Sequence, residues 1–325
     1  MTTISSSASS ADADVYQAAR SGAILVDRSE LGYLLITGET RLDLLNRMST
    51  QKVDRLRKGE GAATILTTDI GRIIDRLILY SDEDAVTCLT GAGNSENIAR
   101  YLMRFVFFMD DFHIKDRSQQ TTILAIYGPE APQILGNFID DPSSIPLHHW
   151  REVEIVGSSA RLLRSDPIAG HGFFITCAVE DKASVQSALI SSGAITSDQP
   201  TFEYLRVESG VPLLGSELTS DYIPLEAGLR DDISFNKGCY IGQEIIARMD
   251  SRGKLAKRLV RLTSESPIFA ETEIRSGEKR AGTVTSAANG PAGPLALGYV
   301  KSSFLENETA LSVNGVPITV IAAAG

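Results

Sequence analysis

The side chains best suited to chemistry gather in residues 233–248 of this 325-residue chain. The ammonium of Lys237 comes two residues before the thiol of Cys239, and Gly238 and Gly242 flank the thiol. Glycine lets the backbone adopt positive φ or approach another surface closely. The apolar residues that follow fit the start of a buried helix, where the helix dipole and the ammonium both favour a thiolate. Spacing alone favours a Cys239 that only packs, and a reactive Cys239 activated by Lys237 is the alternative.

The overall charge argues against a surface that binds phosphate generally. The chain has 41 acidic and 31 basic residues, a net charge of -10, which repels a nucleic-acid backbone. A local basic cluster that includes Arg252, Lys254 and Lys257 is the expected place for a weak tRNA contact or for the glutamate tail of a folate. A solvated edge of the C-terminal domain is the alternative. No apolar run approaches the roughly 18 to 20 residues of a membrane span, so no membrane partner is expected.

Cysteine usage and the N-terminus indicate the cellular compartment. Cys88 and Cys177 lie in apolar, strand-like runs and are expected to pack, and three widely spaced cysteines form neither a disulfide framework nor a metal-binding pair. This usage fits a reducing compartment. Residues 1–20 begin with a Ser/Ala-rich stretch that resembles neither a secretory signal nor a transit peptide. We expect a disordered tail on a cytoplasmic protein.

The periodicity of the remaining chain predicts an α+β fold. Residues 21–111 are expected to form a first lobe, and several strands with two helices in residues 112–200 predict a second, α+β lobe. Short strands separated by Gly, Pro and Asn in residues 253–325 predict a small β-barrel. Within the first lobe, alternating residues predict a hairpin around the turn at 69–72.

Gly91-Ala92-Gly93 stands between a predicted strand and a predicted helix. Such a position suggests a dinucleotide-binding turn, but the third glycine of that motif is missing, so the interpretation is rejected. The two glycines are instead expected to allow a turn near a ligand.

The uninterrupted run Lys237-Gly238-Cys239-Tyr240-Ile241-Gly242-Gln243-Glu244 resembles the signature of the YgfZ-type folate-binding family. That family is related to the T-protein of the glycine cleavage system. Gly128-Pro129-Glu130-Ala131 and Arg280-Ala281-Gly282-Thr283-Val284-Thr285-Ser286 are similar to further segments of these proteins, so the resemblance covers most of the chain. It implies that residues 21–252 form two α+β lobes, one from 21–111 together with 201–252 and the other from 112–200. These lobes and the barrel would surround a central hole that holds tetrahydrofolate.

The resemblance also implies which residues meet the folate. Arg206-Val207-Glu208-Ser209-Gly210 matches the segment in which T-protein relatives carry the pterin-binding glutamate, so Glu208 is expected to anchor the pterin. A carboxylate suits this role because it accepts two parallel hydrogen bonds, although a solvated helix end is the alternative. The other residues expected at the folate are Arg206, Tyr240, Gln243, Glu244 and Arg248. No metal site is expected.

One departure from the T-protein pattern bears on function. Where T-proteins carry two adjacent aspartates, this chain has Asp75-Arg76, and a guanidinium cannot act as a base. In a strand the two side chains should point to opposite faces. The resemblance then favours a tetrahydrofolate-binding protein that assembles or repairs iron–sulfur clusters and affects tRNA modification indirectly. Iron–sulfur proteins or assembly factors would be its partners, since one cysteine cannot hold a cluster alone.

Two other functions stay open. One is a folate-dependent one-carbon (aminomethyl) transferase or demethylase, in which Asp75 is the candidate proton-transfer group and Cys239 and Lys237 are the other candidate catalytic residues. The other is a tRNA-binding module, which the acidic total charge disfavours.

Overall fold

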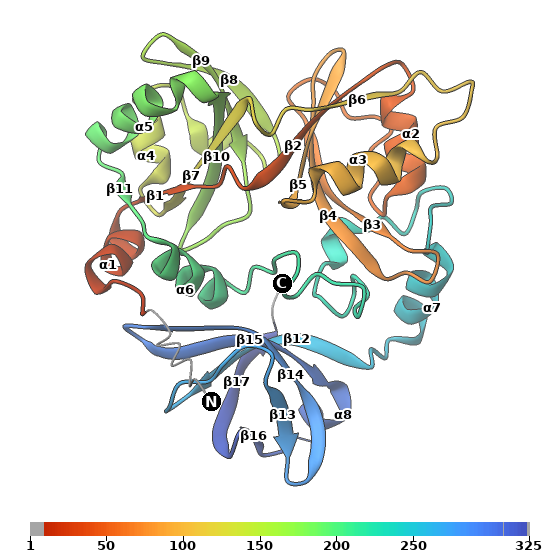
Figure 1. Cartoon of the computed structure of the whole chain (residues 1–325), viewed down its shortest axis with the longest axis vertical. Helices are drawn as coiled ribbons and strands as arrows, with labels where there is room; N and C mark the ends of the chain where they lie inside the picture. The colour runs from red at the N-terminus through yellow and green to blue at the C-terminus, as the bar shows by residue number, and fades with distance from the viewer. Residues whose placement is uncertain (1–9, 308, 324–325) are drawn as a thin grey trace, which may run out of the picture.

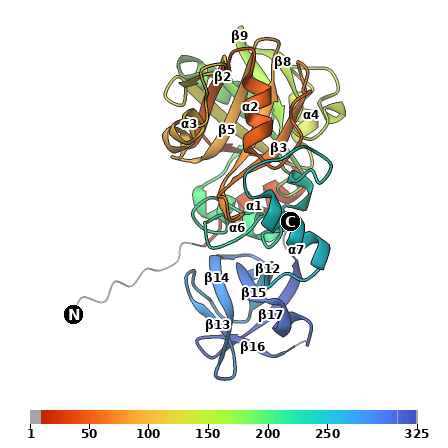
Figure 2. The ribbon, with the colours of Figure 1, turned by 90° about the vertical axis from the view of Figure 1, so that its right-hand side faces the viewer.

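The chain folds into two sheet-containing lobes that stand side by side above a closed barrel (Figure 1, Figure 2). This computed structural model describes residues 10–307 and 309–323. The prediction of two α+β lobes followed by a C-terminal barrel is confirmed.

The first lobe is an antiparallel sheet covered by helices. Apolar residues alternate along β4 (Ile73–Ser81). Leu77 and Leu79 therefore pack under the helices, while Tyr80 belongs to the core shared between the lobes. In spatial order its described strands are β3 (Gly61–Thr67), β4 (Ile73–Ser81), β5 (Ala85–Ala92), β2 (Leu31–Thr37) and β6 (His113–Asp116). The covering helices are α2 (Arg41–Met48) and α3 (Ser95–Met103). The predicted hairpin forms between β3 and β4, and Gly71 adopts a φ of 72° in its turn.

The second lobe also pairs a sheet with helices. In spatial order its described strands are β11 (Ile195–Thr196), β1 (Ile24–Asp27), β7 (Thr121–Gly128), β10 (His171–Ala178), β9 (Ser158–Arg164) and β8 (Trp150–Ile155). Its helical segments are α4 (Ala131–Leu135), η1 (Pro142–Ser144), η2 (Val179–Asp181) and α5 (Lys182–Ser191). Pro132 lies in the first turn of α4, where its missing N–H would be unpaired anyway.

Two strands belong to the lobe opposite to the one in which they were predicted. β1 was expected in the first lobe but pairs with β7 of the second, and β6 was expected in the second but pairs with β2 of the first. The boundaries at residues 21 and 112 are therefore corrected. As a result, the chain crosses between the lobes at residues 28–30 and again at 117–120. Arg28 of the first crossing is buried, whereas most residues of the second crossing are exposed.

A helix begins where a disordered tail was expected. Asp12 accepts hydrogen bonds from the backbone N–H groups of Asp14 and Val15 and so caps α1 (Ala13–Ser21). Tyr16 and Ala19 are buried in the central core. The tail prediction is wrong for this part, and residues 1–9 lie outside the described residues.

The C-terminal domain is a closed barrel with an apolar interior. Its strands within the described residues are β12 (Lys257–Ser264), β13 (Glu273–Ser276), β14 (Lys279–Gly290), β15 (Gly293–Lys301), β16 (Leu311–Val313) and β17 (Val316–Ala323). The helix α8 (Ser302–Leu305) follows β15. The short strand β16 was not predicted, because three residues leave too little alternation to detect.

The helix α6 (Gln199–Ser209) and the following loop lie between the lobes and the barrel (Figure 1). The loop contains η3 (Arg230–Asp232) and leads to α7 (Gln243–Arg252). A core of residues from both lobes, α6 and the barrel meets here, including Tyr80, Tyr127 and Tyr299. Among the described residues, no helix is both long enough and apolar enough to cross a membrane.

Candidate functional site

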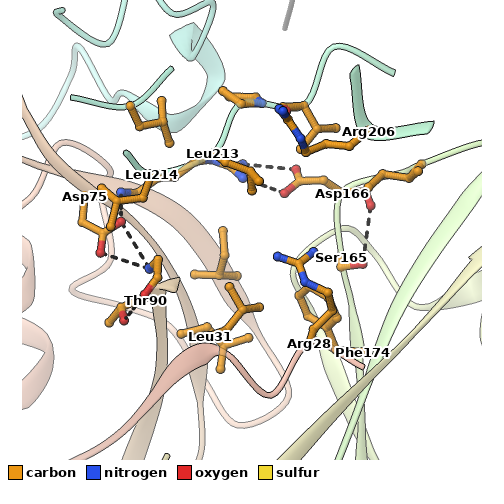
Figure 3. Close-up of a pocket in the computed structure, with 18 of the residues that line it drawn as sticks. Arg28, Leu31, Asp75, Thr90, Ser165, Asp166, Phe174, Arg206, Leu213 and Leu214 are labelled. Carbon is orange, nitrogen blue, oxygen red and sulfur yellow. Dashed lines mark hydrogen bonds and ion pairs between the residues drawn. The ribbon is translucent and has the colours of Figure 1, made fainter. Parts of the chain in front are cut away.

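A cavity of about 100 Å³ lies where the two lobes meet α6 and the loop that follows it (Figure 3). Its wall is largely apolar and includes Leu31, Ile78 and Phe174. The charged side chains that line it come from segments far apart in the sequence: Arg28, Asp75, Arg76, Asp166 and Arg206. The crossing of the chain between the lobes explains why Arg28 reaches this place.

Asp75 is a buried carboxyl group at the edge of the cavity, with 1% of its surface exposed. Its oxygens accept hydrogen bonds from the backbone N–H groups of Arg76 (2.8 Å) and Gly91 (3.0 Å) and from Asn94 Nδ2 (2.8 Å). Burial raises the pKa of Asp75 to about 6, because it outweighs these hydrogen bonds, which lower the pKa. Asp75 can therefore hold or release a proton near neutral pH.

Gly91 makes the Asp75 carboxyl accessible from the cavity. A Cβ atom at this position would lie 2.5 Å from Leu214 Cδ2 and 3.0 Å from Asp75 Oδ1. The sequence indicated a glycine turn near a ligand, and Gly91 does line the cavity.

Arg76 forms an ion-pair bridge beside the cavity. Its Nε donates to Asp232 Oδ2 at 2.6 Å and its Nη1 donates to Asp166 Oδ2 at 2.6 Å. Burial works to lower the pKa of Arg76, but the two carboxylates outweigh it and raise the pKa, while Arg76 lowers the pKa of Asp166 to about 2. Arg76 and Asp75 were expected to point apart, yet both line the cavity, because the arginine side chain is long enough to reach it.

Arg28 points into the cavity from the crossing between β1 and β2 (Figure 3). It is 5% exposed, its Nε donates to Glu30 Oε1 at 2.5 Å, and its guanidinium stands 4.6 Å above the Phe202 ring. Burial works to lower the pKa of Arg28, but Tyr127 and Glu30 outweigh it and raise the pKa. Sequence reasoning missed Arg28, since an arginine after a short strand carries no signal of its own.

Arg206 lines the cavity, but the protein itself uses its donors. Its Nη1 donates to Val211 O at 2.6 Å and to Glu217 Oε2 at 3.1 Å, while Nη2 donates to Ser286 Oγ at 2.7 Å. Glu203 accepts from Nε and Nη2. The expectation that Arg206 binds folate is corrected, because no donor of its guanidinium is left for a ligand.

Glu208 faces away from the central cavity. Its Oε1 accepts a hydrogen bond from the Tyr16 hydroxyl of α1 at 2.9 Å, and Arg20 Nη1 lies 3.6 Å from its Oε2. It lines a different cavity, beside Arg261 of the barrel. Residues two positions apart on a helix point in different directions, and Arg206 is the one that faces the central cavity. The role of Glu208 as pterin anchor stays a prediction, which would place the pterin outside this cavity.

A second cavity of about 230 Å³ adjoins the first across the Arg76 bridge. Both cavities are lined by Arg76, Asp166, Val211 and Pro212. His148 also lines the second cavity, and burial lowers the pKa of this histidine despite the nearby Asp166. Together the two cavities could hold an elongated ligand, with the charged Arg76 and Asp166 at its middle and largely apolar walls at both ends.

Cys239 lies on the surface, in the loop before α7, and not among the residues that line the central cavity. The ammonium of Lys237 donates to the backbone oxygens of Asn46 (2.6 Å), Ser49 (2.7 Å) and Gln51 (2.7 Å). Burial lowers the pKa of Lys237 to about 8. All three ammonium donors therefore hold the end of α2, and the activation of Cys239 by Lys237 stays a prediction.

The rest of the signature builds the structure around α7. Tyr240 is buried in a small apolar cluster, Gln243 begins α7, and Glu244 and Arg248 are exposed on that helix. Within the described residues, none of these four side chains lines the central cavity, and their expected contact with folate stays a prediction.

The basic cluster that follows is partly free and partly packed. Arg252 and Lys254 are exposed, whereas Lys257 donates to Asp221 O and stands 4.3 Å above the Tyr222 ring.

The residues of the central cavity suit a pteridine. A pteridine is a flat heterocycle with hydrogen-bond donors and acceptors on its edges, and the cavity offers apolar walls, the Asp75 carboxyl and the Arg28 guanidinium. The volume is below the roughly 300 to 1,000 Å³ of typical ligand pockets, and Leu213 and Leu214 occupy the wall that would have to move (Figure 3).

Comparison with known proteins agrees with this architecture. Residues 5–237 match the GCVT N-terminal domain, and residues 257–324 match the CAF17 C-terminal β-barrel domain. The glycine cleavage system aminomethyltransferase T from Bartonella henselae has a similar fold, with a TM-score of 0.82 and 23% identity over 94% of this chain and 87% of that chain.

Two relatives illustrate the likeness in sequence. A chloroplastic protein of Arabidopsis thaliana that is named as a transferase on a provisional basis is 31% identical to this chain. The match covers 89% of this chain and 68% of the Arabidopsis protein. An aminomethyltransferase of Rubrobacter xylanophilus is 28% identical over 87% of this chain and 77% of its own. The chain therefore belongs to the GCVT N-terminal domain family and carries a CAF17-type β-barrel at its C-terminus.

Proposed function

We propose that this protein binds tetrahydrofolate in the central cavity and acts in the assembly or repair of iron–sulfur clusters, as a cytoplasmic YgfZ-type member of its family. The observation that carries the folate proposal is the buried, mostly apolar cavity between the lobes, with a carboxyl group at Asp75 and a guanidinium at Arg28. The combination of apolar walls and a few placed polar groups is typical of sites for flat organic ligands. When bound, tetrahydrofolate would supply a carrier of one-carbon units.

The folate enters this site by displacing part of the wall. Leu214 packs against Gly91 and Leu213 lies beside it, in a loop that is only half-buried. Outward movement of this loop would enlarge the central cavity, and the adjoining cavity of about 230 Å³ would receive the aminobenzoyl part. Asp75 would then hold or release a proton beside the ring.

The cluster-related role depends on Cys239. Its thiol is exposed, whereas Cys88 and Cys177 are buried, so Cys239 is the cysteine that a partner protein can reach. The described residues contain no group of three or more metal-binding side chains. Since an iron–sulfur cluster takes about four protein ligands, Cys239 would contribute one ligand and the partner the others.

Calorimetric titration with tetrahydrofolate tests the folate proposal. Wild type and Glu208→Ala should bind, because Glu208 lies outside the central cavity. Asp75→Asn should bind about 10-fold more weakly, the cost of roughly one hydrogen bond to a charged group. Absence of binding by wild type would refute the proposal. A loss confined to Glu208→Ala would move the site to the α1 side of α6.

Replacement of Cys239 tests the cluster role separately. Cys239→Ser should leave tetrahydrofolate affinity unchanged and abolish cluster transfer from a loaded donor protein, followed by the visible absorption of the cluster. Cys177→Ser serves as the matched control, since Cys177 is buried. If Cys239→Ser transfers the cluster at the wild-type rate, Cys239 is not a cluster ligand and the proposed cluster role is refuted.

A folate-dependent aminomethyl transferase is the second candidate, and the raised pKa of Asp75 favours it. The carboxyl could move a proton to or from the substrate amine. Turnover of methylenetetrahydrofolate by wild type, lost in Asp75→Asn, would support this activity. Lack of turnover by a wild-type protein that binds tetrahydrofolate would exclude it.

A further inference from the structure

His148 is a buried imidazole whose ring nitrogens have no hydrogen-bond partner among the described residues. The residue is 8% exposed and lines the second cavity. Its Nδ1 is enclosed and unpaired, and its Nε2 lies 3.8 Å from Asp166 Oδ1, which is too far for a direct hydrogen bond. Leaving a buried polar group without a partner costs about 1 to 3 kcal/mol, so a ligand atom that pairs with this imidazole would be stabilised.

The charges around this imidazole do not balance. Asp166, Asp231 and Asp232 line the second cavity, whereas Arg76 is the only cation among the described residues that line it. Burial lowers the pKa of His148, so the imidazole is neutral at pH 7. Three carboxylates and one guanidinium therefore leave a net charge of -2 at the cavity. An uncompensated charge in a buried site is costly, and a bound cation would offset it.

An organic cation suits the cavity better than a metal ion does. The described residues contain no group of three or more metal-binding side chains, so a divalent ion would lack protein ligands here. Leu147, Pro167 and Leu229 give the same cavity an apolar wall. A short alkyl chain that ends in an ammonium group would match both the wall and the charge.

We propose that the second cavity binds a small primary alkylamine as its ammonium ion, with the nitrogen between His148 Nε2 and Asp166 Oδ1. One nitrogen atom can lie within hydrogen-bond distance of both groups, because they are 3.8 Å apart. An ammonium group has three donors, and a carboxylate oxygen accepts more than one hydrogen bond, so Asp166 keeps its bonds to Arg76. The exposed Asp231 attracts the cation towards the cavity.

This inference goes beyond the proposed function and does not require folate. Val211 and Pro212 form the wall that the two cavities share, and this wall stays available to the aminobenzoyl part of a folate. The carboxylates of the glutamate tail, in contrast, would be repelled by the negative charge of the second cavity.

Ligand-observed saturation-transfer NMR with the full chain tests the proposal. The probe is n-butylammonium, and 1-butanol and butyrate are neutral and anionic molecules of similar shape. Wild type should bind n-butylammonium at least about 10-fold more tightly than 1-butanol, the effect of one hydrogen bond to a charged group. Butyrate should not bind, because the cavity is already negative.

Two variants separate the imidazole from the charge. His148→Asn keeps a residue that tolerates the left-handed φ of 60° at this position but is too short to reach the ammonium, so it should bind n-butylammonium about 10-fold more weakly. His149→Asn is the matched control and should bind as wild type does, since His149 is not among the described residues that line the cavity. Asp231→Asn changes an exposed charge and leaves the Arg76 bridge intact, so it should give a smaller loss that disappears at high salt. Thermal unfolding should show all variants folded.

Four results would overturn the inference. Wild type could fail to bind n-butylammonium. It could bind 1-butanol equally tightly, which would mean that the cavity selects shape and not charge. His148→Asn could bind n-butylammonium as tightly as His149→Asn, which would place the ammonium at another acidic surface. Asp231→Asn could bind as tightly as wild type at low salt. Failure of the proposed function is a distinct outcome, because tetrahydrofolate titration measures it without the amine.

Discussion

Replacement of Glu217 by glutamine should destabilise the protein far more than its charge change alone suggests. Glu217 has no exposed surface, and it accepts hydrogen bonds from Arg206 Nη1 (3.1 Å), Thr285 Oγ1 (2.6 Å) and Ser286 Oγ (2.6 Å). These contacts join α6 to the barrel. In Glu217→Gln the carboxamide places an N–H group against other donors and leaves the buried guanidinium short of one anion. Breaking a buried ion pair in this way costs about 3 to 5 kcal/mol.

The matched control is Glu203→Gln, because Glu203 pairs with the same arginine but keeps 29% of its side chain exposed. Exposed pairs are typically worth about 0 to 1 kcal/mol. Equilibrium urea unfolding of both variants at pH 7 measures the difference. Equal losses in the two variants would refute the reasoning, since burial would then not decide the effect and Arg206 would not be held as a structural group.

Three further perturbations test the site and the thiols. A maleimide should modify the exposed Cys239 of the native protein and leave Cys88 and Cys177 unmodified, because these two are buried and burial raises the pKa of both thiols. Peptide mass spectrometry would identify the modified cysteine. Because burial raises the pKa of Asp75 from 3.8 to about 6, the folded state holds this proton more tightly than the unfolded state, so stability falls as pH rises through that window. The stability of wild type relative to Asp75→Asn should thus drop by roughly 2 kcal/mol between pH 4 and pH 7 in urea unfolding, and a constant difference would contradict the burial of the carboxyl. Gly91→Ala places a methyl group 2.5 Å from Leu214 and 3.0 Å from Asp75, which should cost about 1 to 3 kcal/mol of stability and weaken tetrahydrofolate binding in calorimetry; normal affinity would show that the ligand does not pass this point.

The order and type of the elements could be predicted because their signals are local. The β3–β4 hairpin shows alternating residues around a glycine turn, and the helix at α6 begins after Asp198, whose side chain accepts from Thr201 N. Asp12 is an equally good cap for α1, but the short helix lies in a stretch whose composition suggested disorder. Lobe membership could not be predicted, because the partners of β1 and β6 lie about 80 to 100 residues away and pairing over such distances leaves no trace in one sequence.

The candidate site was harder to predict for the same reason. Lys237 donates to backbone oxygens of residues 46–51, nearly 190 positions away, and nothing in the sequence around Lys237 indicates these partners. Arg206 and Glu208 stand two residues apart on α6, which turns their side chains about 200° from each other. Helical geometry alone was therefore enough to show that the two could not both face one ligand.

Arg76 directly follows Asp75 in β4, and its ion pairs affect the chemistry of that carboxyl group. A free guanidinium next to a carboxyl group would lower its pKa and keep it ionised. The two side chains leave β4 in different directions, and Asp166 and Asp232 engage the charge of Arg76. Burial therefore controls the pKa of Asp75, which rises to about 6 in place of falling. The same bridge ties β4 to the second lobe and to η3, so Arg76 closes the cavity around a carboxyl group that can still exchange a proton at neutral pH.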